Sequence, residues 1–110
     1  MKKSNHFIAT GFVCNEPDIT HFENVDVARF AFAIQMPYID ANGTKNINSA
    51  IIRAEAWRKN NAEKFFARIK KGERLTLEGE LQPNVFFNKK TQTIESKIVL
   101  NAIRIHPNVA

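Results

Sequence analysis

The clearest pattern in the sequence is a strict alternation of apolar and polar residues, which is typical of half-buried β-strands. Residues 26–36 (DVARFAFAIQM) alternate throughout, and Pro37 ends this predicted strand. Residues 51–57 (IIRAEAW) alternate as well, with small or aliphatic side chains at positions 52, 54 and 56. Because successive strand residues point to opposite faces, we expect these positions to face a core and the residues between them to face outward. The outward set is Ile51, Arg53, Glu55 and Trp57.

The first part of the chain is predicted to hold one strand and one loop. Residues 6–14 (HFIATGFVC) are rich in β-branched and aromatic side chains, and Gly11 marks a bend or bulge. Residues 15–25 carry turn-forming side chains, so we expect a loop there. Farther along, Asn42-Gly43 favours the left-handed angles of a type I′ turn, which predicts a hairpin between residues 37 and 50.

The last third of the sequence predicts two further strands that form a long hairpin. Residues 74–82 (RLTLEGELQ) alternate, so we expect the leucines at positions 75, 77 and 81 to face the core and the strand to bend at Gly79. Residues 84–87 and 93–100 are the arms around a turn at 88–91, and the last strand continues to Ile105. Adjacent strand residues point opposite ways, so we expect Phe86 to face outward and Phe87 to lie in the core.

A helical period interrupts the strands only once. Residues 60–71 place Ala62, Phe65, Phe66 and Ile69 along one stripe, which predicts a short helix with an apolar face. Asn60 is the expected N-cap, and Gly72 is expected to end the helix in the left-handed conformation. We expect five phenylalanines to be packing residues, while Phe12 and Phe22 remain unassigned. The packing set is Phe7, Phe30, Phe32, Phe65 and Phe66.

The resulting order, β-β-β-α-β-β, predicts an all-β domain with one short helix. Five strands with a helix between the third and the fourth are the layout of the five-stranded Greek-key barrel called the OB-fold. We expect a flexible N-terminal arm at residues 1–5, a single OB-fold domain at 6–106 and a short C-terminal end at 107–110. No apolar run is long enough for a bilayer, and the single cysteine, Cys14, fits the reducing cytosol, so a cytoplasmic location is expected.

Charge points toward a polyanionic partner. The formal net charge is +5, and eight of the 16 basic residues fall between Arg53 and Arg74. Motifs for catalysis are missing: the sequence has no phosphate-binding loop and no nucleophile elbow. His6, His21 and His106 lack metal-ligand spacing, and Glu78 and Glu80 are expected to form a solvated or interface edge of a strand. We therefore expect no enzyme activity, no metal and no cofactor.

Four segments, in order along residues 6–105, resemble the bacterial single-stranded-DNA-binding proteins. The first is GFVCNEPDI at 11–19, and the second is VARFAFA at 27–33. The third is Trp57-Arg58-Lys59 with the helical segment that follows it, and the fourth is LEGEL at 77–81. No one segment is diagnostic, but their order and spacing make the resemblance specific. The strand-to-helix turn, with Asn60-Asn61, is one residue longer than is usual in that family.

The resemblance implies where bases and phosphates would bind. It places stacking aromatics at Tyr38, Trp57 and Phe86, and it puts Ile51 where the family has another aromatic. Base faces stack on aromatic rings, and lysine or arginine neutralises phosphates, so basic residues beside these rings fit the same chemistry. The expected phosphate contacts are Arg53, Arg58, Lys59, Lys45, Lys89 and Lys90.

The resemblance also implies a function, with two alternatives. A protein of this family would coat exposed single-stranded DNA in replication, recombination and repair, as a homotetramer or, as the second choice, a dimer. The alternatives are a primosomal accessory protein that binds single strands as a dimer, and an OB-fold adaptor whose basic face meets an acidic protein. Family members typically continue into an acidic tail, which this sequence lacks. We therefore expect either a trimmed chain or a short relative that does not recruit partners through a tail.

Overall fold

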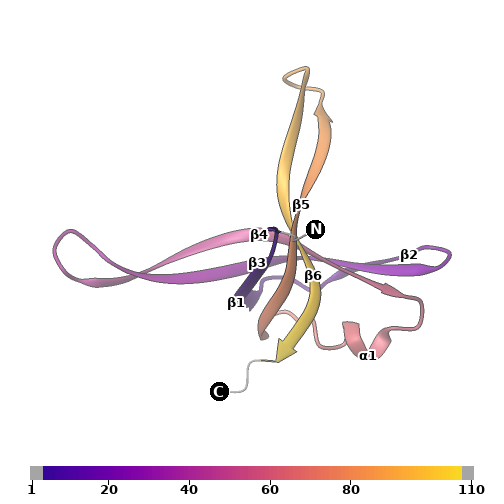
Figure 1. Cartoon of the computed structure of the whole chain (residues 1–110), viewed down its shortest axis with the longest axis horizontal. Coiled ribbons are helices and arrows are strands. Elements are labelled where there is room, and N and C mark those ends of the chain that lie inside the picture. Colours follow the sequence, from indigo (N-terminus) through magenta and orange to yellow (C-terminus); the bar gives the residue numbers. More distant parts are fainter. Residues whose placement is uncertain (1–3, 108–110) are drawn as a thin grey trace.

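The structure is a computed structural model that describes residues 4–107, with side chains described up to residue 106. It consists of long strands and one short helix (Figure 1). The elements are β1 (Phe7–Val13), β2 (Asp18–His21), β3 (Val25–Ile39), β4 (Lys45–Lys59), α1 (Glu63–Phe66), β5 (Arg74–Asn88) and β6 (Thr93–Pro107).

The strands form one sheet that closes on itself. Their order is β1-β5-β6-β4-β3-β2, and a further pairing of β1 with β3 closes five of them into a barrel. All pairings are antiparallel except that of β4 with β6, which meet in parallel at Ala54–Leu100 and Glu55–Asn101. The single helix lies between β4 and β5. This arrangement confirms the predicted all-β OB-fold.

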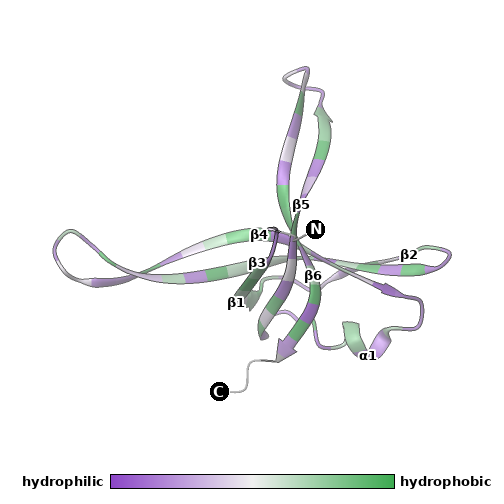
Figure 2. Cartoon of the chain, in the orientation of Figure 1, coloured by the Kyte–Doolittle hydropathy of each residue, from purple (hydrophilic) through white to green (hydrophobic). Residues whose placement is uncertain are grey.

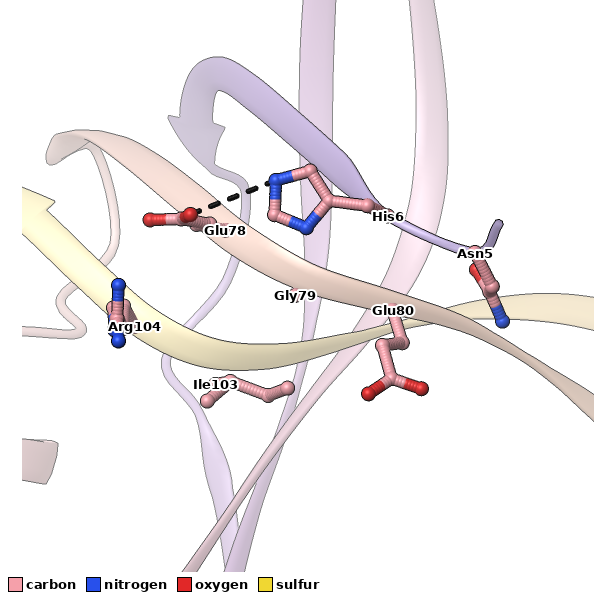
Figure 3. Close-up of a pocket in the computed structure, with 7 residues that line it drawn as sticks. All are labelled: Asn5, His6, Glu78, Gly79, Glu80, Ile103 and Arg104. Atoms are coloured by element: carbon pink, nitrogen blue, oxygen red, sulfur yellow. Dashed lines mark ion pairs between the residues drawn. The ribbon is translucent and has the colours of Figure 1, made fainter. Parts of the chain in front are cut away.

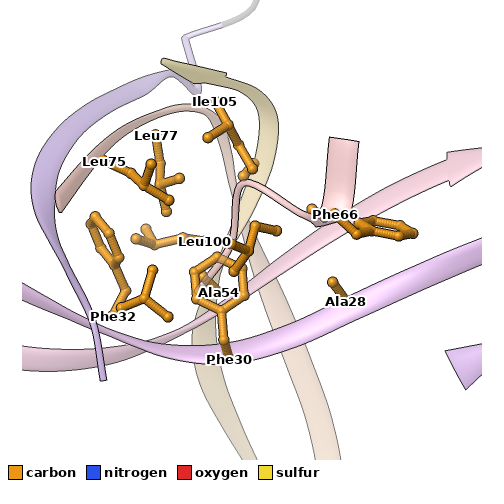
Figure 4. Close-up of a cluster of buried hydrophobic side chains, with 13 residues drawn as sticks. Ala28, Phe30, Phe32, Ala54, Phe66, Leu75, Leu77, Leu100 and Ile105 are labelled. Carbon is orange, nitrogen blue, oxygen red and sulfur yellow. The ribbon is translucent and has the colours of Figure 1, made fainter. Parts of the chain in front are cut away.

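The core fills the barrel with side chains from each of its five strands (Figure 4). Phe30 and Phe32 of β3 and Ala54 and Ala56 of β4 are fully buried, which confirms the inward faces predicted for both strands. Phe66 and Ile69 are buried against them, while Phe7 and Phe65 are partly buried at the edge of the core. The packing role predicted for the five phenylalanines is confirmed.

Gly79 marks the bend in β5 that the sequence predicts. The register of the β5–β6 pair shifts between Glu78 and Gly79, which identifies a β-bulge. A Cβ atom at Gly79 would collide with the backbone carbonyl of Asn101 on the neighbouring strand. Only glycine permits such a close approach of two backbones, and the bend sends the outer half of β5 away from the barrel.

Two hairpins extend well beyond the barrel in different directions (Figure 1). One consists of β3 and β4, and the other of β5 and β6. The prediction that β3 ends at Pro37 is wrong, because this strand continues to Ile39. Proline is compatible with a strand here, since Pro37 has a neighbouring strand, β4, on one side only.

The predicted type I′ turn at Asn42-Gly43 is also wrong. Only Gly43 has a left-handed backbone, with φ of 78°, whereas a type I′ turn needs two such residues. Instead, residues 40–44 form a wider loop. Both Asn42 and Thr44 donate their backbone N–H groups to the Asp40 carboxylate, at 2.9 Å each.

Two predicted segments differ in extent from the structure. Residues 15–25 were expected to be a loop, but they contain β2, which pairs with the start of β3. The helix predicted at 60–71 is a single turn, because backbone hydrogen bonds after Ala67 change to the tighter i to i−3 pattern. Gly72 is left-handed as predicted, with φ of 88°. Asn60 is not the N-cap, since its side chain bonds to Phe22 and Asp26.

The inward positions predicted for Leu81 and Phe87 are wrong. Both side chains are exposed, Phe87 by 55%, because the β5–β6 hairpin has left the barrel at that point. Near the chain ends, Asn5 exchanges hydrogen bonds of 2.7 and 2.9 Å with the backbone of Leu81, and Pro107 ends β6. Most of the predicted arm and C-terminal end, 1–3 and 108–110, lies outside the described residues. In the part that is described, no helix has the length and apolar character needed to cross a membrane.

Candidate nucleic-acid interface

A groove runs over the outer face of β4 and onto the β5–β6 hairpin. Its wider part has a volume of about 480 Å³, and its floor is formed by Ile51 and Val99, with Phe86 and Lys97 on the hairpin side. A second hollow of about 330 Å³ continues toward β2. Arg53, Asn84 and Val99 line both, so we treat them as one feature, the binding groove. Arg53 therefore lies between the two hollows.

Trp57 lies on the same face of β4 as Arg53, which confirms the outward position predicted from strand parity. Its ring is 38% exposed and stacks on Phe22, with ring centroids 5.9 Å apart and an interplanar angle of 12°. The indole Nε1 donates to the Glu55 carboxylate at 3.1 Å, and the Arg29 guanidinium lies 5.8 Å from the ring centroid. The ring is thus held in one orientation before any ligand arrives.

Glu55 and Arg29 connect this aromatic pair to the groove. The Nε of Arg29 donates to the second carboxylate oxygen of Glu55 at 3.0 Å, and both residues line the smaller hollow. A carboxylate on a basic surface would repel phosphates. Here its charge is offset by Arg29, and its oxygens are occupied by the arginine and the indole. The pair therefore positions Trp57 rather than adding free negative charge.

Phe22 is held in place by the turn between β2 and β3. Its backbone N–H donates to the Val25 carbonyl at 2.8 Å, and its own carbonyl accepts from the Asn60 side chain at 3.2 Å. Asn60 also donates to the buried carboxylate of Asp26 at 2.6 Å, which in turn contacts His21 at 2.9 Å. Phe22 is 47% exposed, so a fixed turn presents a largely open ring beside Trp57.

Sequence reasoning left Phe22 unassigned and did not single out Arg29 or Lys97. Phe22 lies in a turn, where alternation gives no information about direction. Lys97 lies with its Nζ 5.6 Å from the centroid of the Phe86 ring, which is half-buried. Lys97 pairs with Asn84, on the same strand face as Phe86, and this depends on the β5–β6 register, which the turn predicted at 88–91 does not give.

The structure places Arg58, one of the predicted phosphate contacts, away from the groove. Arg58 is on the opposite face of β4 from Trp57, with its guanidinium 3.8 Å from the centroid of Phe65. It donates to the Trp57 carbonyl at 2.7 Å and to the Ile103 carbonyl. Burial lowers the pKa of Arg58 from its usual value, as expected for a cation partly removed from water. Arg58 therefore joins β4 to α1 and β6.

The remaining predicted residues are spread over the hairpins. Register between β3 and β4 is unbroken from Val25 to Ile39, so Tyr38 lies on the face opposite Trp57 and Arg53. Lys45 shares the face of Arg53, but at the far tip of that hairpin. Lys59 is exposed at the end of β4, and Lys89 and Lys90 are exposed in the β5–β6 turn. Arg53 and Phe86 thus line the binding groove, Trp57 lies beyond it on the same face of β4, and Tyr38 lies outside it.

A separate polar cluster lies on the outer surface of β1, β5 and β6 (Figure 3). His6 and His106, which are far apart in the sequence, both approach the Glu78 carboxylate, at 3.5 and 3.2 Å. The hollow beside them has a volume of about 410 Å³ and includes Glu80 and Arg104. Glu78, which was predicted to lie on a solvated or interface edge, is therefore a carboxylate paired with two histidines, one before β1 and one in β6.

Comparison with known proteins agrees with this fold. The chain matches the model of the single-strand binding protein family over residues 4–106. A small single-stranded DNA-binding protein from Streptomyces coelicolor has a TM-score of 0.73 and 16% identity, with 98% of this chain and 97% of that chain covered. An SSB from Plasmodium falciparum, in complex with ssDNA, has a TM-score of 0.81 and 18% identity, with 99% and 98% covered.

A third structure is a deletion mutant of the single-stranded DNA binding protein from Thermus aquaticus. It has a TM-score of 0.76 and 20% identity, and the match covers 96% of this chain and 50% of that chain. No curated protein sequence matches the chain. At these identities the structural likeness establishes the fold, while the family model spans nearly the whole chain. The chain therefore belongs to the single-strand binding protein family.

Proposed function

We propose that this protein binds single-stranded DNA without sequence preference and coats exposed strands during replication, recombination and repair. Membership of the single-strand binding protein family supports this function. The observation that carries it is the binding groove itself, where the Trp57–Phe22 pair and Phe86 flank a surface that holds Arg53 and Lys97. Aromatic rings beside cations are what unpaired bases and phosphates require.

Base stacking is the source of sequence tolerance in this proposal. Each base has a flat π-face, so a ring accepts any base, at about 1–3 kcal/mol per stacked base. Trp57 and Ile51 are six residues apart on one strand face, which corresponds to roughly 20 Å. That distance accommodates several nucleotides between Trp57 and the Phe86 end of the groove. Ile51, which is 71% exposed at a position where the family has an aromatic residue, would give an apolar contact without a π-face.

Phosphate contacts supply the rest of the affinity. Arg53 lies between the two hollows, Lys97 lies beside Phe86, and Lys89 and Lys90 extend the basic surface to the hairpin tip. Neutralising each phosphate on a single strand releases counterions, so log K falls with log salt by about 0.7 for each contact. Three to four contacts therefore correspond to a slope of roughly −2 to −3.

The proposal describes a binding protein that catalyses no reaction. It acts in the cytoplasm and keeps single strands free of secondary structure until other enzymes use them. The oligomeric state that we propose is a homotetramer, and the alternative is a dimer.

Fluorescence anisotropy of labelled oligonucleotides tests this function. We expect tight binding of oligo-dT, binding of mixed-sequence strands within about tenfold of it, and much weaker binding of duplex DNA of the same length, because duplex bases are already stacked. The affinity should fall steeply with salt. Equal affinity for duplex and single strand would refute base stacking. An affinity that does not change with salt would instead favour the OB-fold adaptor.

A further inference from the structure

The two parts of the binding groove differ in their chemistry. The smaller hollow contains the carboxylates of Asp18 and Glu55 and the guanidinium of Arg29. None of the described residues that line the larger hollow is acidic, and half of them are aliphatic, namely Ile51, Ile52, Ile98 and Val99. They come from β4 and β6, and Figure 2 shows apolar bands along both of these strands. The larger hollow is therefore the apolar part of the groove.

Ile51 is the most exposed of these aliphatic side chains. It is 71% exposed, whereas Val99 is 5% exposed. Its neighbour across the strand pair is Ala33 of β3, whose single methyl group is too small to cover it. A ligand in the larger hollow would therefore remove apolar surface of Ile51 from water, which is favourable.

An aliphatic side chain distinguishes bases by their apolar surface. It has no π-system, so it cannot provide the ring stacking that accepts every base alike. It gains instead from each methyl group that leaves water on contact with it. Among the bases of DNA only thymine carries such a group, at C5, and apolar side chains contact this methyl group in protein–DNA complexes. Uracil has the same ring without the methyl group. An exposed isoleucine in the groove therefore favours thymine over uracil.

The polar side chains of the larger hollow fit the rest of a thymine base. Thymine has two carbonyl oxygens, which accept hydrogen bonds, and one ring N–H, which donates. Arg53 and Lys97 offer only donors, and the amide of Asn84 offers both donors and an acceptor. In the described part of the chain, the side chains of Arg53 and Asn84 form no hydrogen bond or ion pair, so both are available to a ligand. Carboxylates, which suit the amino groups of other bases, line only the smaller hollow.

We propose that the larger hollow binds a thymine base with its C5 methyl group against Ile51, and that the protein thereby distinguishes thymine from uracil. This inference rests on the proposed function, because it requires a single strand in the binding groove. It concerns one base of the strand, so the Trp57 end of the groove still accepts any base. Burial of one methyl group corresponds to a change in affinity of about fourfold. A preference of this size stays within the range of about tenfold that we expect between sequences.

Oligonucleotides that differ only in this methyl group test the inference. Oligo-dT and oligo-dU of the same short length have the same sugars, phosphates and polar base edges, so anisotropy titrations compare the effect of the methyl group alone. We expect the wild type to bind oligo-dT about fourfold more tightly than oligo-dU. Ile51→Ala should reduce this ratio to less than about twofold, mainly by weakening the binding of oligo-dT.

Ile47→Ala is the matched control. Ile47 is on the same face of β4 as Ile51 and is exposed to a similar extent, 65%, but it lines neither hollow. We expect this variant to keep the ratio of about fourfold, and urea unfolding checks that both variants are folded. A ratio that Ile51→Ala leaves unchanged, or that Ile47→Ala lowers as much, would overturn the inference.

Failure of this inference and failure of the proposed function give different results. Equal affinities for oligo-dT and oligo-dU, with much weaker binding of duplex DNA, would leave the proposed function intact and refute recognition of the methyl group. If the wild type binds neither oligonucleotide, the proposed function is refuted, and this inference with it.

Discussion

Replacing Phe22 with alanine is the most informative single change, because it removes one ring of the aromatic pair and leaves Trp57 in place. The turn that holds Phe22 depends on backbone groups and on the Asn60 and Asp26 side chains, which the substitution leaves unchanged. Since 47% of Phe22 is already exposed, we expect a loss of stability of about 1–2 kcal/mol, well below the 3–5 kcal/mol of a fully buried phenylalanine. The variant should therefore remain folded.

The expected effect on binding follows from the stacked geometry. With centroids 5.9 Å apart and ring planes 12° apart, Phe22 stacks on Trp57 and supports the orientation of the indole. Removing the contact that keeps the indole oriented should weaken oligo-dT binding about tenfold, or about 1.4 kcal/mol. Phe22→Ala and Trp57→Ala together should weaken binding by less than the sum of their separate effects, because both act on the same base.

Anisotropy titrations with a short oligo-dT measure these affinities, and urea unfolding checks stability in parallel. Phe87→Ala is the matched control, since it removes the same ring from a similarly exposed side chain, 55%, on the face of the β5–β6 hairpin opposite Phe86. We expect the control to bind a short strand as the wild type does. An affinity of Phe22→Ala within twofold of wild type, with the fold intact, would refute a role of the Phe22–Trp57 stack in binding.

Three further predictions concern single residues. Arg58→Ala should lower the free energy of unfolding by about 2 kcal/mol, because two backbone carbonyls lose a charged donor, and urea unfolding measures this loss. At a matched folded fraction, its affinity for oligo-dT, measured by anisotropy, should differ from that of the wild type by less than about threefold. Ile51→Trp should tighten oligo-dT binding about fivefold or more by adding a π-face to the groove, and unchanged affinity would contradict the position of that groove. Lys97→Ala should make the slope of log K against log salt shallower by about 0.7, whereas an unchanged slope would mean that Lys97 contacts no phosphate.

Strand parity made the central part of the site predictable from the sequence. Alternation in residues 51–57 separates the buried Ala54 and Ala56 from the outward Arg53 and Trp57, and the structure has the same division. The same rule argues against Arg58 as a groove residue, since neighbours on a strand point to opposite faces. Its proximity to Trp57 in the sequence suggested a shared role that the backbone geometry does not allow.

What alternation cannot predict is where a barrel ends. Leu81 and Phe87 keep the inward parity of Leu77, but the bulge at Gly79 carries them out of the core. Tyr38 and Trp57 lie on opposite faces of the β3–β4 hairpin. Because they are on different strands, parity gives this result only when the register of the whole β3–β4 pair is known to be unbroken. Phe22 was beyond prediction for another reason: it lies in a turn, whose position is fixed by hydrogen bonds from Asn60 and to Val25 that alternation does not show.

The central claim is that Trp57 stacks on a base of the bound strand, and its fluorescence tests this directly because it is the only tryptophan in the chain. Titration with unlabelled oligo-dT should quench the Trp57 emission strongly and to saturation, with a midpoint that matches the affinity from anisotropy. High salt should reverse the quenching as the strand dissociates. Emission that stays unchanged while anisotropy reports a saturated complex would contradict the account, because the strand would then bind elsewhere on the protein.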